Sequence, residues 1–158
     1  MDNQIYLKRY RLSVGRNGLP VELHRAPTSV TYRAHEIATG REVALERVTA
    51  DTSAAGFREL LESEAAVAQK ISQLNIPTLY DFGFEEGELV FVTEHFDGHT
   101  AATWVGARGP LSTAATLRVA LQVVAAMDAM AFHRIYHHAL NPDNIIFLNA
   151  ETEVRDWP

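Results

Sequence analysis

Apolar and polar positions alternate in six short runs over the first 93 residues, and a period of two predicts β-strands. Glycine and polar residues separate these runs, as expected for tight turns. The runs therefore predict three hairpins, over residues 10–14 with 21–23, 30–37 with 43–48, and 79–84 with 89–93.

One helix is predicted between the second and third hairpins, over about residues 54–74, with its N-cap at Asp51, Thr52 or Ser53. Its apolar stripe at helical spacing consists of Phe57, Leu60, Leu61, Ala68 and Ile71. Glu64 falls inside this stripe. An unpaired buried carboxylate is costly, so Glu64 either has a partner or a solvent-lined cleft, or lies at the edge of the stripe and reaches water.

The second half of the chain changes to a helical pattern. Residues 97–100 predict a loop, and residues 100–107 a short helix. Ser112 is a suitable N-cap for a long helix that reaches about His133. This helix is apolar nearly all round, so it is expected to be covered by other protein.

After that helix, residues 141–144 have the composition of a turn, and residues 145–148 form an apolar run of strand length. A strand-rich first part followed by a helical part predicts an α+β fold.

Composition limits the function. The 158 residues carry a net charge of −6, which argues against a nucleic-acid-binding face. The absence of cysteine excludes disulfides and thiolate zinc sites. No run of 18 apolar residues and no signal sequence are recognised, so a protein without a membrane segment, in the cytoplasm, is expected.

Several segments, in order, resemble motifs of the protein kinase family. Residues 30–34 and 39–46 resemble its second and third strands, and Glu64 matches its helix-C glutamate. Residues 91–96 resemble the last front-lobe strand and the hinge, and residues 137–144 resemble the catalytic loop. The resemblance implies a serine/threonine kinase-like fold whose amino-terminal lobe is an antiparallel sheet with one helix.

The resemblance also implies three regions and an end point. They are an extension with an extra hairpin over 1–22, an amino-terminal lobe over 23–96, and an incomplete carboxy-terminal lobe over 97–158. The last region would hold the hinge exit, the first helices and the catalytic loop. The sequence is expected to stop before the Asp-Phe-Gly segment, because Asp156 is followed by Trp157.

The residues at the family's catalytic positions differ from the family pattern. The glycine-rich loop falls on residues 24–29, which contain no glycine. Glu46 stands at the phosphate-anchoring lysine, Ala139 at the catalytic aspartate and Asn141 at the catalytic-loop lysine. The resemblance thus implies no intact catalytic residue and a vestigial nucleotide cleft at His24, Ala26, Ser29, Thr31, Ala44, Glu46, Glu64, Thr93, Glu94 and Phe96.

Glu46 would face Glu64 in this fold. Two carboxylates ~4 Å apart repel by about 4 kcal/mol at an effective dielectric constant of 20. One of them then takes a proton, a cation lies between them, or the helix moves away. Alternatively, Glu46 is a solvated residue at the edge of the sheet.

Metal binding has two weak candidates. Asn144 matches the magnesium ligand of the family, although asparagine in such a turn is also favoured by local structure. His133, His137 and His138 have a spacing compatible with zinc, but they have neither a cysteine nor a carboxylate to complete the site. Structural histidines are the favoured interpretation.

The resemblance with these departures predicts a pseudokinase: a catalytically inactive, kinase-like binding and regulatory domain in signalling, without a nucleotide cofactor. The alternative is an atypical ATP-binding transferase that uses magnesium or manganese. A third hypothesis is one module of a membrane-attached receptor kinase. The expected interaction surfaces are the helix around Glu64 and helix 112–133, the latter covered by a protein partner or by the remainder of a longer chain.

Overall fold

The computed structural model describes residues 4–49, 57–138 and 140–148. The chain divides into two compact units, residues 1–72 with 77–95 and residues 73–76 with 96–158. The three regions predicted from the sequence stay predictions.

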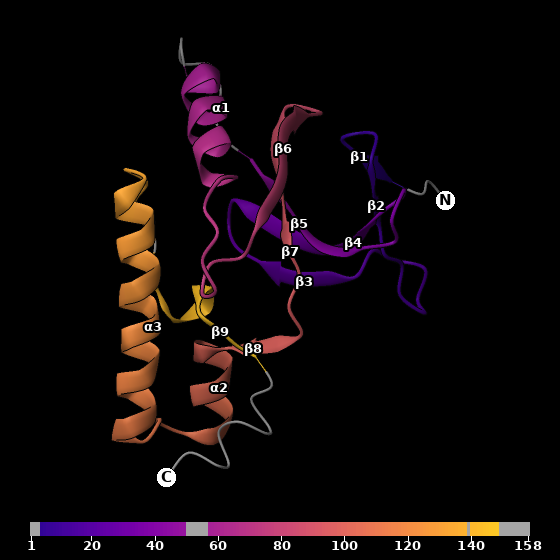
Figure 1. The fold of residues 1–158 in the computed structure, drawn as a ribbon. Coiled ribbons are helices and arrows are strands. Elements are labelled where there is room, and N and C mark those ends of the chain that lie inside the picture. Colours follow the sequence, from indigo (N-terminus) through magenta and orange to yellow (C-terminus); the bar gives the residue numbers. More distant parts are fainter. Residues whose placement is uncertain (1–3, 50–56, 139, 149–158) are drawn as a thin grey trace. The chain divides into compact units, whose positions relative to one another are not determined.

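The first unit is an antiparallel sheet with one helix (Figure 1). The strand order is β1-β2-β4-β5-β7-β6, and β3 also pairs with β4. Its elements are β1 (Ile5–Tyr6), β2 (Tyr10–Leu12), β3 (Glu22–Arg25), β4 (Ser29–Glu36), β5 (Glu42–Val48), α1 (Phe57–Ala68), β6 (Leu79–Glu85) and β7 (Glu88–Glu94). The predicted second and third hairpins are confirmed as β4–β5 and β6–β7.

The first hairpin is confirmed only next to its turn, where the Val21 N–H donates to the Ser13 carbonyl at 2.9 Å and the Gly15 N–H donates to the Leu19 carbonyl at 2.8 Å. β2 and β3 do not pair with each other as strands; both pair with β4, at residues 34–36 and 30–32. The segment between them leaves the sheet after Ser13, returns at Val21 and has a single bridge, between Val14 and Pro20. The Arg33 carbonyl accepts from the Ser13 N–H, and the Arg33 N–H donates to Val21, so β4 satisfies both sides of the interruption.

The hairpin of β1 and β2 was missed. Leu7 and Lys8 form its turn with φ values of 50° and 56°, and neither residue type signals a turn that needs positive φ. The Leu7 N–H donates to Glu85 Oε2 at 2.6 Å. A Cβ at Gly83 would lie 2.6 Å from Leu7 Cδ2, so the Leu7 side chain occupies space that a glycine of β6 leaves open.

The core of this unit lies on one face of the sheet. Strand alternation directs Ala34, Val43, Leu45, Val90 and Val92 to the same face, and each is 0–1% exposed. The β1–β2 hairpin covers this cluster with three further buried side chains, Tyr6, Tyr10 and Leu12. Burial of the Tyr10 ring raises the pKa of its hydroxyl to about 12.

One buried carboxylate secures the same hairpin. Glu36, which is 4% exposed, accepts from Thr39 Oγ1 and from Arg9 Nε, at 2.5 and 2.7 Å. Arg9 Nη1 also lies 3.5 Å from Asp81 Oδ2 on β6. The hydrogen bond from Thr39 and then that from Arg9 lower the pKa of Glu36.

α1 is shorter than the predicted helix and packs against β6 (Figure 1). Tighter bonds from Lys70 to Val67 and from Ile71 to Ala68 end it. Ala65 and Ile71 are buried, but Leu60 is 55% exposed, which corrects the predicted stripe. The three predicted N-cap residues lie outside the described residues.

The second unit contains β8 (Gly98–Thr100), α2 (Ala101–Arg108), α3 (Thr113–Phe132), a 3₁₀ turn (Pro142–Asn144) and β9 (Ile146–Leu148). Ser112 caps α3 as predicted, its hydroxyl accepting from the Ala115 N–H at 3.2 Å. Residues 98–100 were predicted as loop but pair with β9. Gly98 permits this, since a Cβ there would lie 2.5 Å from the Phe147 carbonyl oxygen. The α+β fold class is confirmed.

Candidate functional site

The face of the sheet opposite the core gathers most of the predicted cleft residues of the first unit. Paired residues of neighbouring strands share a face. The register therefore aligns Thr31, Glu46, Phe91 and Phe82 in one row across four strands, and places Ala44 beside Thr93 in the next. The predicted residues on this face are His24, Ser29, Thr31, Ala44, Glu46 and Thr93.

The other predicted residues lie elsewhere. Ala26 belongs to the turn between β3 and β4. Glu94 alternates to the core face, where its carboxylate accepts from the N–H and Oγ1 of Thr78, at 3.3 and 3.2 Å. Glu64 is exposed on α1, so the second alternative for this residue, that it reaches water, is the one observed. Phe96 belongs to the second unit.

The segment at the position of the glycine-rich loop is a closed turn. The Ala26 N–H donates to the Ser29 carbonyl at 2.9 Å, and Pro27, which has no N–H, occupies the turn between them. A loop that cradles phosphates offers several free backbone N–H groups. This turn uses one N–H internally and lacks a second, which makes it a poor cradle.

Beside this turn lies a pocket of about 260 Å³, which the sequence analysis missed. Two arginines line it, but each is engaged by a glutamate. Arg25 Nη2 lies 2.5 Å from Glu22 Oε2, and Arg47 Nη2 lies 2.5 Å from Glu88 Oε2. Because the cations are already paired, this pocket offers little net positive charge to an anion.

Glu46 is half-buried in the middle of its row, between Thr31 and Phe91. Within residues 4–49, 57–138 and 140–148, no lysine or arginine lies within ion-pair distance of its carboxylate. Arg33 on the same face lies 3.0 Å from Glu42. This face therefore presents an acidic group where phosphate binding requires a cation.

In the second unit, the polar turn organises residues 141–146. Asn141 Oδ1 accepts from the Asp143 N–H at 2.8 Å, and the Asn144 N–H donates to the Asn141 carbonyl at 3.1 Å. The Ile145 carbonyl accepts from the Ala101 N–H at 2.8 Å, which fixes the turn to the start of α2. Ala139 lies outside the described residues.

The predicted metal ligands do not lie in a cluster of ligand side chains within the described residues. Across the described part of the chain, no group of three or more histidine, aspartate or glutamate side chains is placed to hold an ion. His137 and His138 are exposed, and the His138 ring lies edge-on to Tyr136 at 6.2 Å between centroids. Asn144 as a metal ligand stays a prediction, and Asp156 lies outside the described residues.

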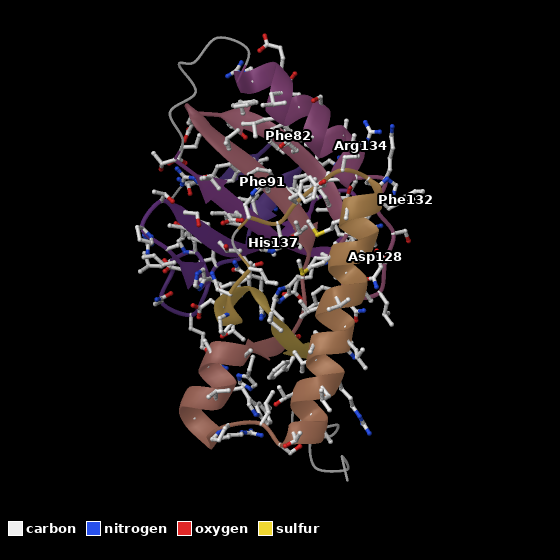
Figure 2. The ribbon with its side chains drawn as sticks, turned by 90° about the vertical axis from the view of Figure 1, so that its left-hand side faces the viewer. Phe82, Phe91, Asp128, Phe132, Arg134 and His137 are labelled. Carbon is white, nitrogen blue, oxygen red and sulfur yellow. The ribbon has the colours of Figure 1, made fainter. Side chains whose placement is uncertain are left out.

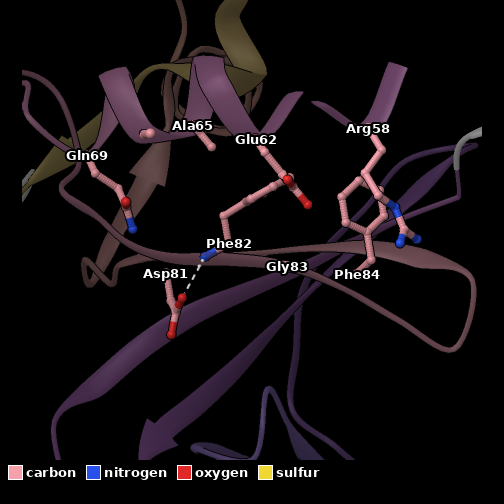
Figure 3. Close-up of a pocket in the computed structure, with 9 residues that line it drawn as sticks. Arg58, Glu62, Ala65, Gln69, Asp81, Phe82, Gly83 and Phe84 are labelled. Carbon is pink, nitrogen blue, oxygen red and sulfur yellow. Dashed lines mark hydrogen bonds between the residues drawn. The ribbon is translucent and has the colours of Figure 1, made fainter. Parts of the chain in front are cut away.

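A second pocket, of about 420 Å³, lies between α1 and β6. Figure 3 shows Phe82 and Phe84 rising from β6 toward α1, while Glu62 and Arg58 reach from α1 toward β6. The Arg58 guanidinium lies 4.1 Å from the centre of the Phe84 ring. This groove was not predicted from the sequence, although two phenylalanines at positions i and i+2 of a strand face the same side and indicate an apolar surface there.

α3 leaves most of its large apolar side chains exposed within the described residues. Figure 2 shows the side chains along α3 and labels Phe132, which is 84% exposed. The other large exposed side chains are Leu117, Leu121, Val124 and Met127. By length and composition α3 could cross a membrane, with a mean hydropathy of 1.4. No such segment was predicted from the sequence, and the core helix of a soluble protein can have the same length and composition.

A family model and two similar proteins relate this chain to protein kinases. A family model described as Protein kinase domain matches residues 25–157. Over 118 residues the chain is 33% identical to Cell division control protein 2 homolog 3 of Trypanosoma brucei brucei, covering 74% of this chain and 38% of that protein. Over 116 residues it is 30% identical to serine/threonine-protein kinase PrkC of Bacillus subtilis (strain 168), covering 73% and 18%.

A solved structure shows the same fold. It is described as the crystal structure of Rad53 1-466 in complex with AMP-PNP, and it matches with a TM-score of 0.73 and 21% identity. The match covers 86% of this chain and 35% of that one. The chain thus spans between about a fifth and two fifths of the proteins it resembles, and the predicted fold is confirmed.

Proposed function

Because the chain belongs to the protein kinase domain family, we propose that it is a kinase-like domain without phosphotransfer, acting as a binding and regulatory module in signalling. Glu46 carries this proposal. In active kinases a lysine of the third strand pairs with the helix-C glutamate and holds the phosphates. Here that position is a carboxylate on the same face as Ala44 and Thr93, and a carboxylate repels phosphate.

Two further features support the loss of phosphotransfer. The turn over residues 26–29 is closed by its own hydrogen bond and contains a proline. Ala139, at the position of the catalytic aspartate, cannot accept a proton from a substrate hydroxyl. Positioning and electrostatics supply nearly all of the catalysis in this family, so these losses together leave little activity.

The proposal implies that neither ATP nor a metal ion is a cofactor. It also retains a cytoplasmic location, because a chain without cysteine uses no disulfide. The competing proposal is a transferase that binds nucleotide through a magnesium or manganese ion held by Glu46, Glu64 and Asn144. Glu46 and Glu64 both belong to the first unit, but Asn144 belongs to the second.

A thermal-shift titration with ATP alone, with ATP and Mg²⁺, and with ATP and Mn²⁺ tests the two. A ligand at 100 times its Kd adds about 2.7 kcal/mol of stability, which raises the Tm of a domain of this size by about 5–10 °C. We expect no saturable shift at millimolar ATP. A metal-dependent, saturable shift that Glu46→Ala abolishes would support the transferase and overturn our proposal.

A further inference from the structure

Polar side chains form a row across the sheet face opposite the core. The strand register aligns Ile5 on β1, Arg11 on β2, His35 on β4 and Glu42 on β5. These strands are neighbours in the sheet (Figure 1), and residues directly opposite each other have Cβ atoms about 4.5–5.5 Å apart. His95 follows β7 and continues the row, since its Nε2 lies 4.0 Å from Glu42 Oε1. The row therefore gathers one arginine, two histidines and one glutamate on one side of the sheet.

Arg11 has no acceptor within the described part of the chain. Its side chain forms neither a hydrogen bond nor an ion pair there, and its Nε is buried. Arg9, Arg25 and Arg47 of the same unit, by contrast, each pair with a glutamate. A buried N–H group without an acceptor costs free energy. An oxyanion bound at Arg11 would supply the acceptor and remove this cost.

Arg33 places a second guanidinium group next to the row. Alternate residues of a strand point to the same side, so Arg33 shares the face of His35. Diagonal neighbours on paired strands lie about 7–8 Å apart, within reach of long side chains, so Arg33 and Arg11 can contact one ligand. Arg33 Nε lies 3.0 Å from Glu42 Oε1, and the two side chains are 36% and 49% exposed. An ion pair this exposed is weak, so a dianion can replace Glu42.

The apolar end of the row narrows the class of ligand. Ile5, opposite Arg11, is 42% exposed. We propose that the row binds a phosphorylated segment of a partner protein, whose phosphate group is held by Arg11 and Arg33 and whose neighbouring aliphatic side chain packs on Ile5. A phosphate monoester carries nearly two negative charges and three acceptor oxygens, which suit two guanidinium groups better than a single carboxylate does. Such binding goes beyond the proposed function and does not depend on the loss of phosphotransfer.

Fluorescence anisotropy with short labelled peptides tests the proposal. The probe contains one phosphoserine next to a leucine, and the comparison peptides have serine or glutamate in place of the phosphoserine. We expect saturable binding of the phosphopeptide, at least about tenfold tighter than binding of either comparison peptide. The chain carries a net charge of −6, so general electrostatic attraction does not favour an anionic peptide. Inorganic phosphate should displace the probe only at high concentration, because it offers nothing that packs on Ile5.

Three variants and a control locate the site. Arg11→Gln should weaken phosphopeptide binding about tenfold, and Arg11→Lys, which keeps the charge but not the planar fork, should weaken it less. Glu42→Gln should strengthen binding about two- to fivefold, because it releases Arg33 from its ion pair. A misfolded variant cannot produce this gain. Arg16→Gln removes the same charge from an exposed position between β2 and β3, outside the row, and should leave the affinity within about twofold.

Four results would each overturn the proposal. They are equal affinity for the serine or glutamate peptide, unchanged affinity in Arg11→Gln, an equal loss in Arg16→Gln, and competition by inorganic phosphate as strong as that by the unlabelled phosphopeptide. The outcomes are separable from those of the nucleotide titration. A response to ATP that Glu46→Ala abolishes would overturn only the proposed loss of nucleotide binding, whereas phosphopeptide binding should persist in Glu46→Ala and weaken in Arg11→Gln.

Discussion

Similar apolar side chains are buried in the sheet of the first unit and exposed on helix α3 of the second unit. Leu45 at the centre of the sheet is 0% exposed, whereas Leu121 on α3 is 70% exposed. The sheet closes its own core, because the β1–β2 hairpin covers the apolar face that the other strands leave. On α3, by contrast, none of the described residues covers the outward apolar side chains in this way.

This difference shows that the first unit buries its apolar side chains with its own residues. Burial of apolar surface stabilises by about 25 cal/mol per Å², and only covered side chains gain it. The first unit gains it fully over a continuous cluster. α3 gains little from its outward side chains, which agrees with a chain spanning only part of the length of its relatives.

The largest effect is expected from Leu45→Ala. Removing a fully buried leucine side chain leaves a cavity and should lower the free energy of unfolding by about 2–5 kcal/mol. Urea unfolding followed by far-UV circular dichroism measures it. A loss below about 1 kcal/mol would mean that the sheet core is less tightly packed than the burial of Leu45 indicates.

A smaller effect, dependent on pH, is expected from Glu36→Gln. The pKa of Glu36 is lowered in the folded chain from an ordinary value of 4.5, by Thr39 first and then by Arg9. The carboxylate therefore contributes stability above about pH 4.5, and this contribution disappears as the pH falls through the folded pKa. The wild type should be more stable than the variant at pH 7, and the two should converge on acidification.

Urea midpoints between pH 7 and pH 3 measure this convergence. Glu42→Gln is the matched control, because Glu42 also pairs with an arginine on the sheet but is half exposed, where ion pairs contribute little. A difference between wild type and Glu36→Gln that persists unchanged at pH 3 would show that Glu36 acts through packing rather than through its charge.

The sequence predicted elements well where local chemistry decides them. The β6–β7 turn has glycine at position 87, with φ of 82°, and the α3 cap has a serine, and both were found from residue type alone. The β1–β2 turn was not predicted, because Leu7 and Lys8 adopt positive φ without a local sequence signal for it. That turn is held by Gly83 and Glu85, more than 70 residues away, and a one-dimensional pattern does not contain that contact.

In the candidate site, too, some features follow from the sequence pattern and others depend on packing. Ala44 and Glu46 share a face because alternate residues of one strand point to the same side. Thr93 joins them through the pairing of β5 with β7, whose register no turn sets, and only the resemblance to the kinase family predicted it. The α1–β6 groove was not found, because its shape depends on how far a helix with small side chains stands from the strand. Periodicity assigned Leu60 to the core, and only the packing shows it exposed.

The smallest effect is expected from Leu121→Ala, and it tests the comparison most directly. The same atoms are removed as in Leu45→Ala, but from a side chain that is 70% exposed. An exposed substitution away from special features changes stability by about 0.5 kcal/mol or less, and alanine favours the helix slightly. Urea unfolding of this chain should therefore show the two leucine variants differing by about 2 kcal/mol or more. Equal losses would mean that α3 is covered in solution, by a second copy or otherwise, and sedimentation of the wild type at several concentrations would then distinguish a dimer from a rearranged monomer.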